Sequence, residues 1–139
     1  MGEIKLTYQV DGGDLIQAGE ASSKMKMTLK KLGLPAEAIR RASICMYEGE
    51  INMVIHANGG RVEVDVGMDA ITLRLIDHGP GIPDVNQAME EGFTTAGDVA
   101  RDLGFGAGMG LPNMKRYSDE MRIDTTVGVG TTVTMKIRI

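Results

Sequence analysis

Hydrophobic and polar residues alternate along several stretches of the chain, which is the pattern of a strand with one face buried and the other in water. The alternating stretches are residues 3–10, 61–66, 71–76 and 131–139, and a shorter strand is expected near residues 121–126. A short connection at residues 67–70 predicts a hairpin between the two strands on either side of it. The alternation therefore predicts a sheet with one covered face.

Apolar residues recur at helical spacing in two other stretches of the chain. The first begins near Asp14, whose spacing from Gln17 resembles a capping box, and it is expected to end at Gly33. The second covers residues 35–57, and a third helix is expected to start at Leu111-Pro112, because proline is favoured at the first helical position. This order of elements predicts an α+β fold with helices on one face of a mixed, mostly antiparallel sheet.

Composition narrows the class of protein. The chain has 139 residues, 42% of them hydrophobic and 24% charged, so we expect one globular domain that spans residues 1–139. Its net charge of −4 argues against electrostatic binding of nucleic acid. The single cysteine, Cys45, has no partner for an internal disulfide, and no apolar stretch is long enough for a leader peptide or a membrane span. A cytoplasmic protein without a membrane partner is expected.

Two polar residues lie on a partly apolar side of the second helix. At about 100° per residue, Glu48 and Asn52 are one turn apart and share that side with Ile51. Glu50 is expected on the opposite, exposed side. Burying a carboxylate without a partner is costly, so Glu48 and Asn52 form either a buried hydrogen-bonded pair or part of a ligand site.

Two further polar residues are expected to face the helices from the strands. Asp77 follows Leu73 and Leu75 at the period of two that keeps side chains on one face of a sheet. Thr131 shares the inward face of the last strand. Asp77 also precedes Gly79-Pro80-Gly81, and an aspartate in that position can serve only to begin a turn. The coincidence of these residues with Glu48 and Asn52 favours a shared ligand.

Glycine is over-represented in the chain, with 19 residues, several of them between residues 79 and 110. The run from Gly104 to Gly110 alternates glycine with other residues and leads directly into the expected third helix. Backbone N–H groups at a helix N-terminus bind anions well, so a phosphate site is one interpretation and a simple linker is the other. The run matches neither the P-loop nor the dinucleotide-binding fingerprint, which excludes those two nucleotide folds.

Four short boxes, taken together and in order, resemble those of the GHKL ATPase superfamily, whose Bergerat fold is a two-layer sandwich. They are Glu48 with Asn52, Asp77 to Gly81, Gly104 to Gly110, and Gly130-Thr131. Residues 82–95 and 110–116 look especially like the bacterial anti-sigma factors and switch-protein serine kinases of stress signalling. Residues 97–103 make the glycine-rich segment longer than in those relatives. The resemblance covers nearly the whole chain.

The resemblance implies an ATP site that uses Mg²⁺. Asp77 would accept hydrogen bonds from the amino group of adenine, with Thr131 in support through a water molecule. Gly79 and Gly81 would let the backbone pass beside the base. Asn52 would bind the Mg²⁺ ion. The residues implied to lie over the phosphates are Gly104, Gly106, Gly108, Gly110 and Leu111.

By the same resemblance, Glu48 would be the general base of a protein serine/threonine kinase that phosphorylates a STAS-domain antagonist protein in a partner-switching pathway. A sigma factor or a phosphatase would be a further partner, and a homodimer is compatible with the resemblance. Two alternatives stay open: an ATP-binding anti-sigma or adaptor module with negligible turnover, and a stand-alone histidine-kinase ATPase domain. The lack of a helical dimerisation segment before the domain disfavours the last.

Several residues stand outside that pattern. Gly49 interrupts the second helix, where glycine costs about 0.5–1 kcal/mol relative to alanine, so the helix is expected to bend or to approach another backbone closely. His56 is expected to be structural, and Cys45 to be buried packing without reactivity. Lys115 and Arg116 are expected to be solvated.

Overall fold

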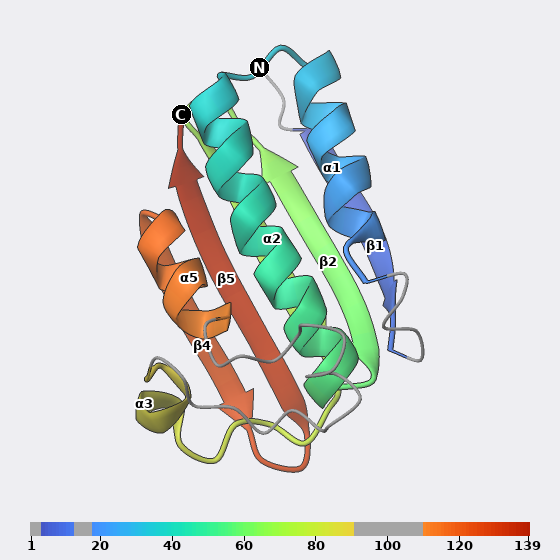
Figure 1. The fold of residues 1–139 in the computed structure, drawn as a ribbon, viewed down its shortest axis with the longest axis vertical. Helices are drawn as coiled ribbons and strands as arrows, with labels where there is room; N and C mark the ends of the chain where they lie inside the picture. The colour runs from blue at the N-terminus through green and yellow to red at the C-terminus, as the bar shows by residue number, and fades with distance from the viewer. Residues whose placement is uncertain (1–3, 13–17, 91–109) are drawn as a thin grey trace.

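The structure, a computed structural model, describes residues 4–12, 18–90 and 110–139. Figure 1 shows how the helices and strands of these residues are arranged. In chain order they are β1 (Ile4–Asp11), α1 (Glu20–Lys31), α2 (Ala36–His56), β2 (Gly59–Val66), β3 (Ala70–Asp77), α3 (Val85–Ala88), α5 (Gly110–Tyr117), β4 (Glu120–Thr126) and β5 (Gly130–Arg138). The expected strands and helices are present, and α3 is an addition that the pattern did not predict.

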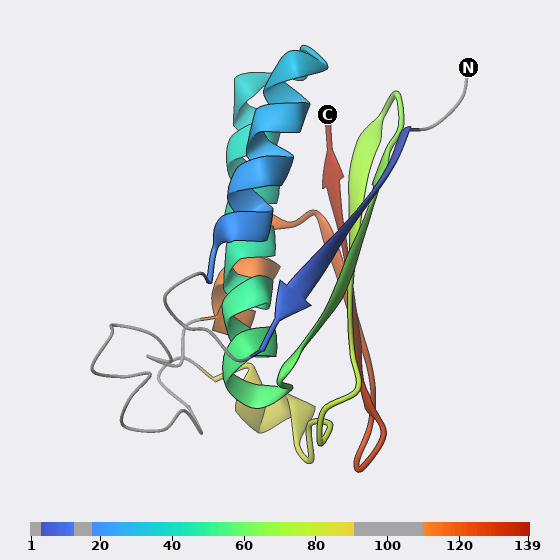
Figure 2. The same cartoon turned by 90° about the vertical axis from the view of Figure 1, so that its right-hand side faces the viewer.

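The strands form one sheet in the order β1-β2-β3-β5-β4. β5 lies between β3 and β4 and runs in the direction opposite to both. Each described pair of strands is therefore antiparallel, and the mixed sheet that the sequence predicts is not found in this part of the chain. The hairpin of β2 and β3 is present as expected. Figure 2 shows the sheet edge-on, with α1, α2 and α5 all on one side of it. The two-layer α+β fold is confirmed.

The core lies between the sheet and the helices. Along residues 62–66 of β2, residues 70–76 of β3 and all of β5, every second residue is buried, as the strand period of two requires. The largest fully buried side chains include Met25, Leu29, Met46, Ile71, Leu73, Met114, Met135 and Ile137. Burial of each such side chain contributes about 1.5–3 kcal/mol of transfer free energy. Methionine is prominent among them, which suits its adaptable side chain.

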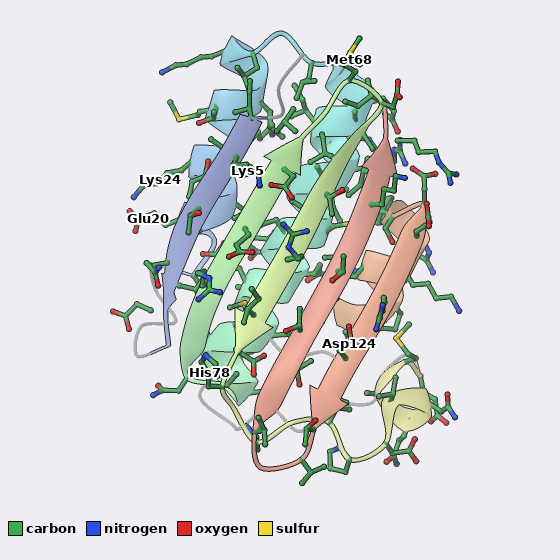
Figure 3. All side chains as sticks on the ribbon, turned by 180° about the vertical axis from the view of Figure 1, so that it is seen from behind. Lys5, Glu20, Lys24, Met68, His78 and Asp124 are labelled. Carbon is green, nitrogen blue, oxygen red and sulfur yellow. The ribbon has the colours of Figure 1, made fainter. Side chains whose placement is uncertain are left out.

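The other face of the sheet carries charged side chains in ion pairs (Figure 3). Arg74 of β3 lies between two acids of β2, 2.6 Å from the Asp65 carboxylate and 3.3 Å from that of Glu63. On the neighbouring strands, Lys136 lies 3.7 Å from Glu120. Pairs at such exposure contribute at most about 1 kcal/mol each. The charged side chains keep this face of the sheet in contact with water, and the candidate site lies on the other face, in the helix layer.

Gly49 allows α2 to lie closely against β3. A Cβ atom at this position would come within 2.1 Å of Leu75 Cδ2 and 3.5 Å of Met114 Sδ. The close approach expected at this glycine is therefore to the Leu75 side chain of β3 rather than to another backbone. The helix continues through it from residue 36 to residue 56.

The start of α1 falls later than expected. Its first residue is Glu20, and the preceding Gly19 has a φ of 101°, a left-handed conformation that glycine adopts readily. The expected capping residues Asp14 and Gln17 lie outside the described residues. At the other end α1 stops as expected, with Gly33 at a φ of 78°.

Glu50 supplies the cap at the start of α1, and the expectation that this acid is exposed is wrong. The residue is 3% exposed. Its carboxylate accepts hydrogen bonds from the backbone N–H groups of Gly19 at 2.9 Å, Ala21 at 3.2 Å and Ser22 at 3.0 Å. A carboxylate at a helix N-terminus satisfies donors that have no partner within the helix. The projection of a single helix did not show that α1 packs against this side of α2.

Glu50→Gln is expected to destabilise the fold by about 2 kcal/mol or more. Both carboxylate oxygens accept backbone hydrogen bonds in the wild type, and in the variant an NH₂ donor would face at least one of these N–H groups. Urea unfolding measures the change. Glu20→Gln is the matched control, since Glu20 is exposed and pairs with Lys24 one turn away at 3.1 Å. That change should cost less than about 0.5 kcal/mol. Equal losses in both variants would show that the cap contributes little.

Candidate functional site

The polar residues singled out in the sequence come from three elements that meet at one end of the molecule. In Figure 1 the C-terminal half of α2, the start of α5 and the loop that leaves β3 lie at the same end. Figure 3 labels His78, the residue after β3, at the end of the sheet opposite Met68. The site is therefore built from a helix pair and a strand end.

Glu48 and Asn52 lie on one side of α2, one turn apart, and both are half-buried. Nδ2 of Asn113 on α5 donates a hydrogen bond to Oε2 of Glu48 at 2.5 Å. Glu48 thus has its partner on a second helix, and a hydrogen-bonded pair of Glu48 with Asn52 is not what the structure shows. Sequence reasoning missed Asn113, since nothing in the pattern indicates how α5 packs on α2.

The start of α5 lies against Asn52. A Cβ atom on Gly110 would be 3.0 Å from both Oδ1 and Nδ2 of the Asn52 amide, so the glycine lets the start of α5 lie directly against this amide. Leu111 is 9% exposed and belongs to the hydrophobic core. Its side chain therefore packs the fold, and the expected contact of its backbone with phosphate stays a prediction.

Asp77 ends β3 with its carboxylate fixed through one oxygen. Oδ1 accepts hydrogen bonds from the backbone N–H groups of Gly79 at 2.9 Å and Thr131 at 3.2 Å. Among the described residues, no donor is bonded to Oδ2. The bond to Gly79 is the one expected of an aspartate that begins a turn. The same side chain therefore serves the turn with one oxygen and leaves the other as an acceptor.

Thr131 is 7% exposed and connects this turn to the edge of the sheet. Its hydroxyl lies 2.8 Å from that of Thr125, its partner on β4, and Thr125 Oγ1 accepts a hydrogen bond from the N–H group of Ile82 at 2.9 Å. Thr131 supports Asp77 directly through its backbone, and its water-mediated role stays a prediction. Thr125 was missed, although the alternation of β4 places it on the helix side.

Gly79 and Gly81 let the loop after β3 pack against neighbouring backbone. A Cβ atom on Gly79 would lie 2.7 Å from Cα of Ala57 at the end of α2, and one on Gly81 would lie 2.6 Å from the carbonyl oxygen of Thr126. Gly81 also has a φ of 81°. The contact of these glycines with a base stays a prediction. Outside the described residues lie Gly104, Gly106 and Gly108.

Cys45 is buried packing, as expected. It is 0% exposed, and burial raises the pKa of its thiol to about 12, which keeps it protonated and unreactive. Lys115 and Arg116 are exposed, as expected.

His56 lies one turn beyond Asn52 on α2 and is half-buried. Burial lowers its pKa, because a low-dielectric environment disfavours the imidazolium form. Below about pH 6.5 the unfolded chain then binds more protons than the folded chain, so stability falls as the pH decreases from about 7.5 to 5.5. His56→Gln is expected to flatten this part of the stability curve, as measured by thermal unfolding across a buffer series. An equally steep curve in the variant would assign the pH dependence to other groups.

The oxygen atoms of the side chains at the site fit ATP with one Mg²⁺ ion. Oδ2 of Asp77 is an acceptor, which suits the amino group of a purine. Asn52 presents an amide oxygen beside Gly110. Mg²⁺ is commonly held by one or two protein oxygens and otherwise by phosphate oxygens and water. The described part of the chain contains no group of three or more His, Cys, Asp or Glu side chains that could hold a metal ion.

The sequence matches the model of the histidine kinase-like ATPase domain over residues 13–137, and the chain belongs to this family. The resemblance to GHKL proteins of the anti-sigma and switch-kinase type is thereby confirmed. The serine/threonine-protein kinase RsbT of Bacillus subtilis is 32% identical over 108 residues, which cover 75% of each chain. An anti-sigma F factor of Clostridium beijerinckii is 32% identical over 101 residues, which cover 73% of this chain and 64% of that protein.

A solved structure has the same fold. It contains the RsbU and RsbW domains of a Mycobacterium tuberculosis protein and superposes with a TM-score of 0.63, covering 97% of this chain and 32% of that one. The identity is 19%, so this likeness supports the fold alone. None of the helices in residues 4–12, 18–90 and 110–139 is long and apolar enough to cross a membrane.

Proposed function

We propose that the chain is an ATP- and Mg²⁺-dependent protein serine/threonine kinase of the anti-sigma or switch type. Its substrate would be a STAS-domain antagonist protein in a partner-switching pathway of the cytoplasm, with a sigma factor or a phosphatase as the further partner. The observation that carries the proposal is that an acid, Glu48, and an amide, Asn52, lie one turn apart on α2, at the same end of the molecule as the anchored carboxylate of Asp77. The kinase and anti-sigma factors among the relatives support the reaction class.

The adenine end of the nucleotide would be read by Asp77. Because two backbone N–H groups hold Oδ1, the carboxylate is oriented before any ligand arrives. Oδ2 would then accept a hydrogen bond from the exocyclic amino group of adenine. A charged acceptor of this kind makes hydrogen bonds that are worth about 1.5–3 kcal/mol each.

The phosphate end would lie between α2 and the start of α5. Bound Mg²⁺ supplies charge neutralisation and orientation of the triphosphate. Asn52 would hold the ion through its amide oxygen, and the backbone N–H groups of Gly110 and Leu111 would face the phosphate oxygens. These residues bind and orient the nucleotide without taking part in bond changes.

Glu48 would act on the acceptor hydroxyl. Its carboxylate would take the proton of a serine or threonine hydroxyl in the partner protein while that oxygen attacks the γ-phosphorus. The bond from the γ-phosphorus to the bridging oxygen breaks, and ADP leaves with the electron pair. General base catalysis supplies about 10²–10⁴-fold of the acceleration, and positioning with charge neutralisation supplies the rest.

Incubation of the chain with γ-labelled ATP, Mg²⁺ and purified STAS-domain proteins of the same organism tests the proposal. One of these proteins is expected to gain a phosphoryl group at a serine or threonine, which mass spectrometry locates, and EDTA is expected to stop the transfer. Binding of ATP without transfer to any of them would favour the adaptor module. A chain that binds no ATP would overturn both functions.

A further inference from the structure

The hydrogen bond between α5 and α2 restricts the carboxylate that would act as base. Asn113 and Glu48 lie 65 positions apart in the chain, and Nδ2 of the first donates to Oε2 of the second at 2.5 Å. An amide NH₂ group is a donor only, so the bond engages Oε2, and among the described residues no donor is bonded to Oε1. One orientation of the Glu48 carboxylate is thereby selected.

The support for Asn113 is firmly packed. Met114, its neighbour, is 1% exposed, and its carbonyl oxygen accepts a long hydrogen bond of 3.7 Å from Sγ of Cys45 on α2. A Cβ atom at Gly49 on the same helix would be in ordinary van der Waals contact with the Met114 sulfur at 3.5 Å, so α5 packs directly on α2 here. The turn of α5 that carries Asn113 is therefore held against the turn of α2 that carries Glu48.

A second contact fixes the register of the two helices. Gly110 lies against the Asn52 amide, and Asn113, three residues later, bonds to Glu48, four residues before Asn52. Residues three and four apart share one face of a helix. One face of α5 therefore meets both side chains of α2 that the proposed reaction uses, and it sets their relative position.

We propose that Asn113 is a positioning residue of the phosphoryl-transfer reaction, which holds the Glu48 carboxylate with one oxygen turned toward the acceptor hydroxyl. The inference rests on the proposed function, in which Glu48 is the base. Because Asn113 acts through Glu48 and does not touch ATP, its loss lowers the rate of transfer and leaves nucleotide affinity unchanged. Displacement of a reacting group by about 1 Å can cost about 100-fold in rate.

Asn113→Ala is expected to lower the single-turnover rate of transfer from ATP to the STAS-domain protein by about 10- to 100-fold, with the Kd for ATP within about twofold of wild type. Asn113→Asp keeps the shape but places a second carboxylate against Glu48, so it should be at least as slow. Asn113→Gln retains the amide donor and should recover part of the rate. Asn86→Ala removes an exposed asparagine of α3 and should transfer at the wild-type rate.

A readout independent of turnover is the ¹⁵N signal of the Asn113 side-chain amide, identified by its disappearance in Asn113→Ala. It is expected to shift in Glu48→Gln and to stay in place in Asn86→Ala. A wild-type rate in Asn113→Ala, a parallel loss of rate and ATP affinity in that variant, or an unmoved amide signal overturns the inference. A wild-type chain that binds ATP but transfers no phosphoryl group overturns the kinase itself, so the two failures are distinguishable.

Discussion

Glu48→Gln is expected to lower phosphoryl transfer by at least about 100-fold while ATP binds with nearly unchanged affinity. Glutamine has almost the same shape as glutamate, and its amide oxygen can still accept the hydrogen bond from Asn113. It cannot accept the proton of the attacking hydroxyl, so the chemical step loses its base. Single-turnover transfer to the STAS-domain protein and calorimetric titration with ATP measure the two quantities separately.

A matched control for this variant lies on the same helix. Glu37 is an exposed acid of α2 that pairs with Arg40 at 2.7 Å, far along the helix from the site. Glu37→Gln is expected to leave both transfer and ATP affinity at wild-type values. Wild-type transfer by Glu48→Gln would remove Glu48 from the mechanism and leave another group to take the proton.

Asp77→Asn is expected to weaken ATP binding by about 10- to 100-fold, which corresponds to the loss of one charge-assisted hydrogen bond. Two backbone N–H groups hold Oδ1, so in the variant the amide oxygen takes that place and the NH₂ group replaces Oδ2. A donor would then face the amino group of adenine. Guanine carries an oxygen at the same ring position, so the ratio of GTP to ATP affinity should rise.

Titration of Asp77→Asn with ATP and with GTP checks both parts of this expectation. Asp84→Asn is the control, because Asp84 caps α3 through the N–H group of Gln87 and asparagine caps a helix about as well as aspartate. It should bind both nucleotides like wild type. If Asp77→Asn bound ATP at full strength, the assignment of adenine to this carboxylate would be refuted.

The strands and the central helix could be predicted from the sequence because their periods are clear. β2, β3 and β5 bury alternate residues, and α2 runs between a proline and a loop almost where the pattern placed it. The start of α1 could not be predicted in this way. It depends on Gly19 in a left-handed conformation and on a carboxylate from another helix, neither of which has a local signal.

The residues of the candidate site likewise fall into those that the sequence could predict and those that it could not. Periodicity placed Glu48, Asn52 and Asp77 on faces that look into the helix layer, because burial of polar groups on those faces demands an explanation. It could not place Asn113 against Glu48, or Glu50 beneath α1, since both contacts follow from how two helices pack together. Contacts between side chains of two different helices are therefore the part of this site that could not be predicted from the sequence alone.

The register that joins β3 to β5 brings together residues 54 positions apart, Asp77 and Thr131. The entropy lost on closing a flexible stretch of chain grows only with the logarithm of its length, at about 0.6 kcal/mol for each doubling. The strand pairing can therefore hold the aspartate and the threonine together at a small additional entropic cost, despite their separation in the chain.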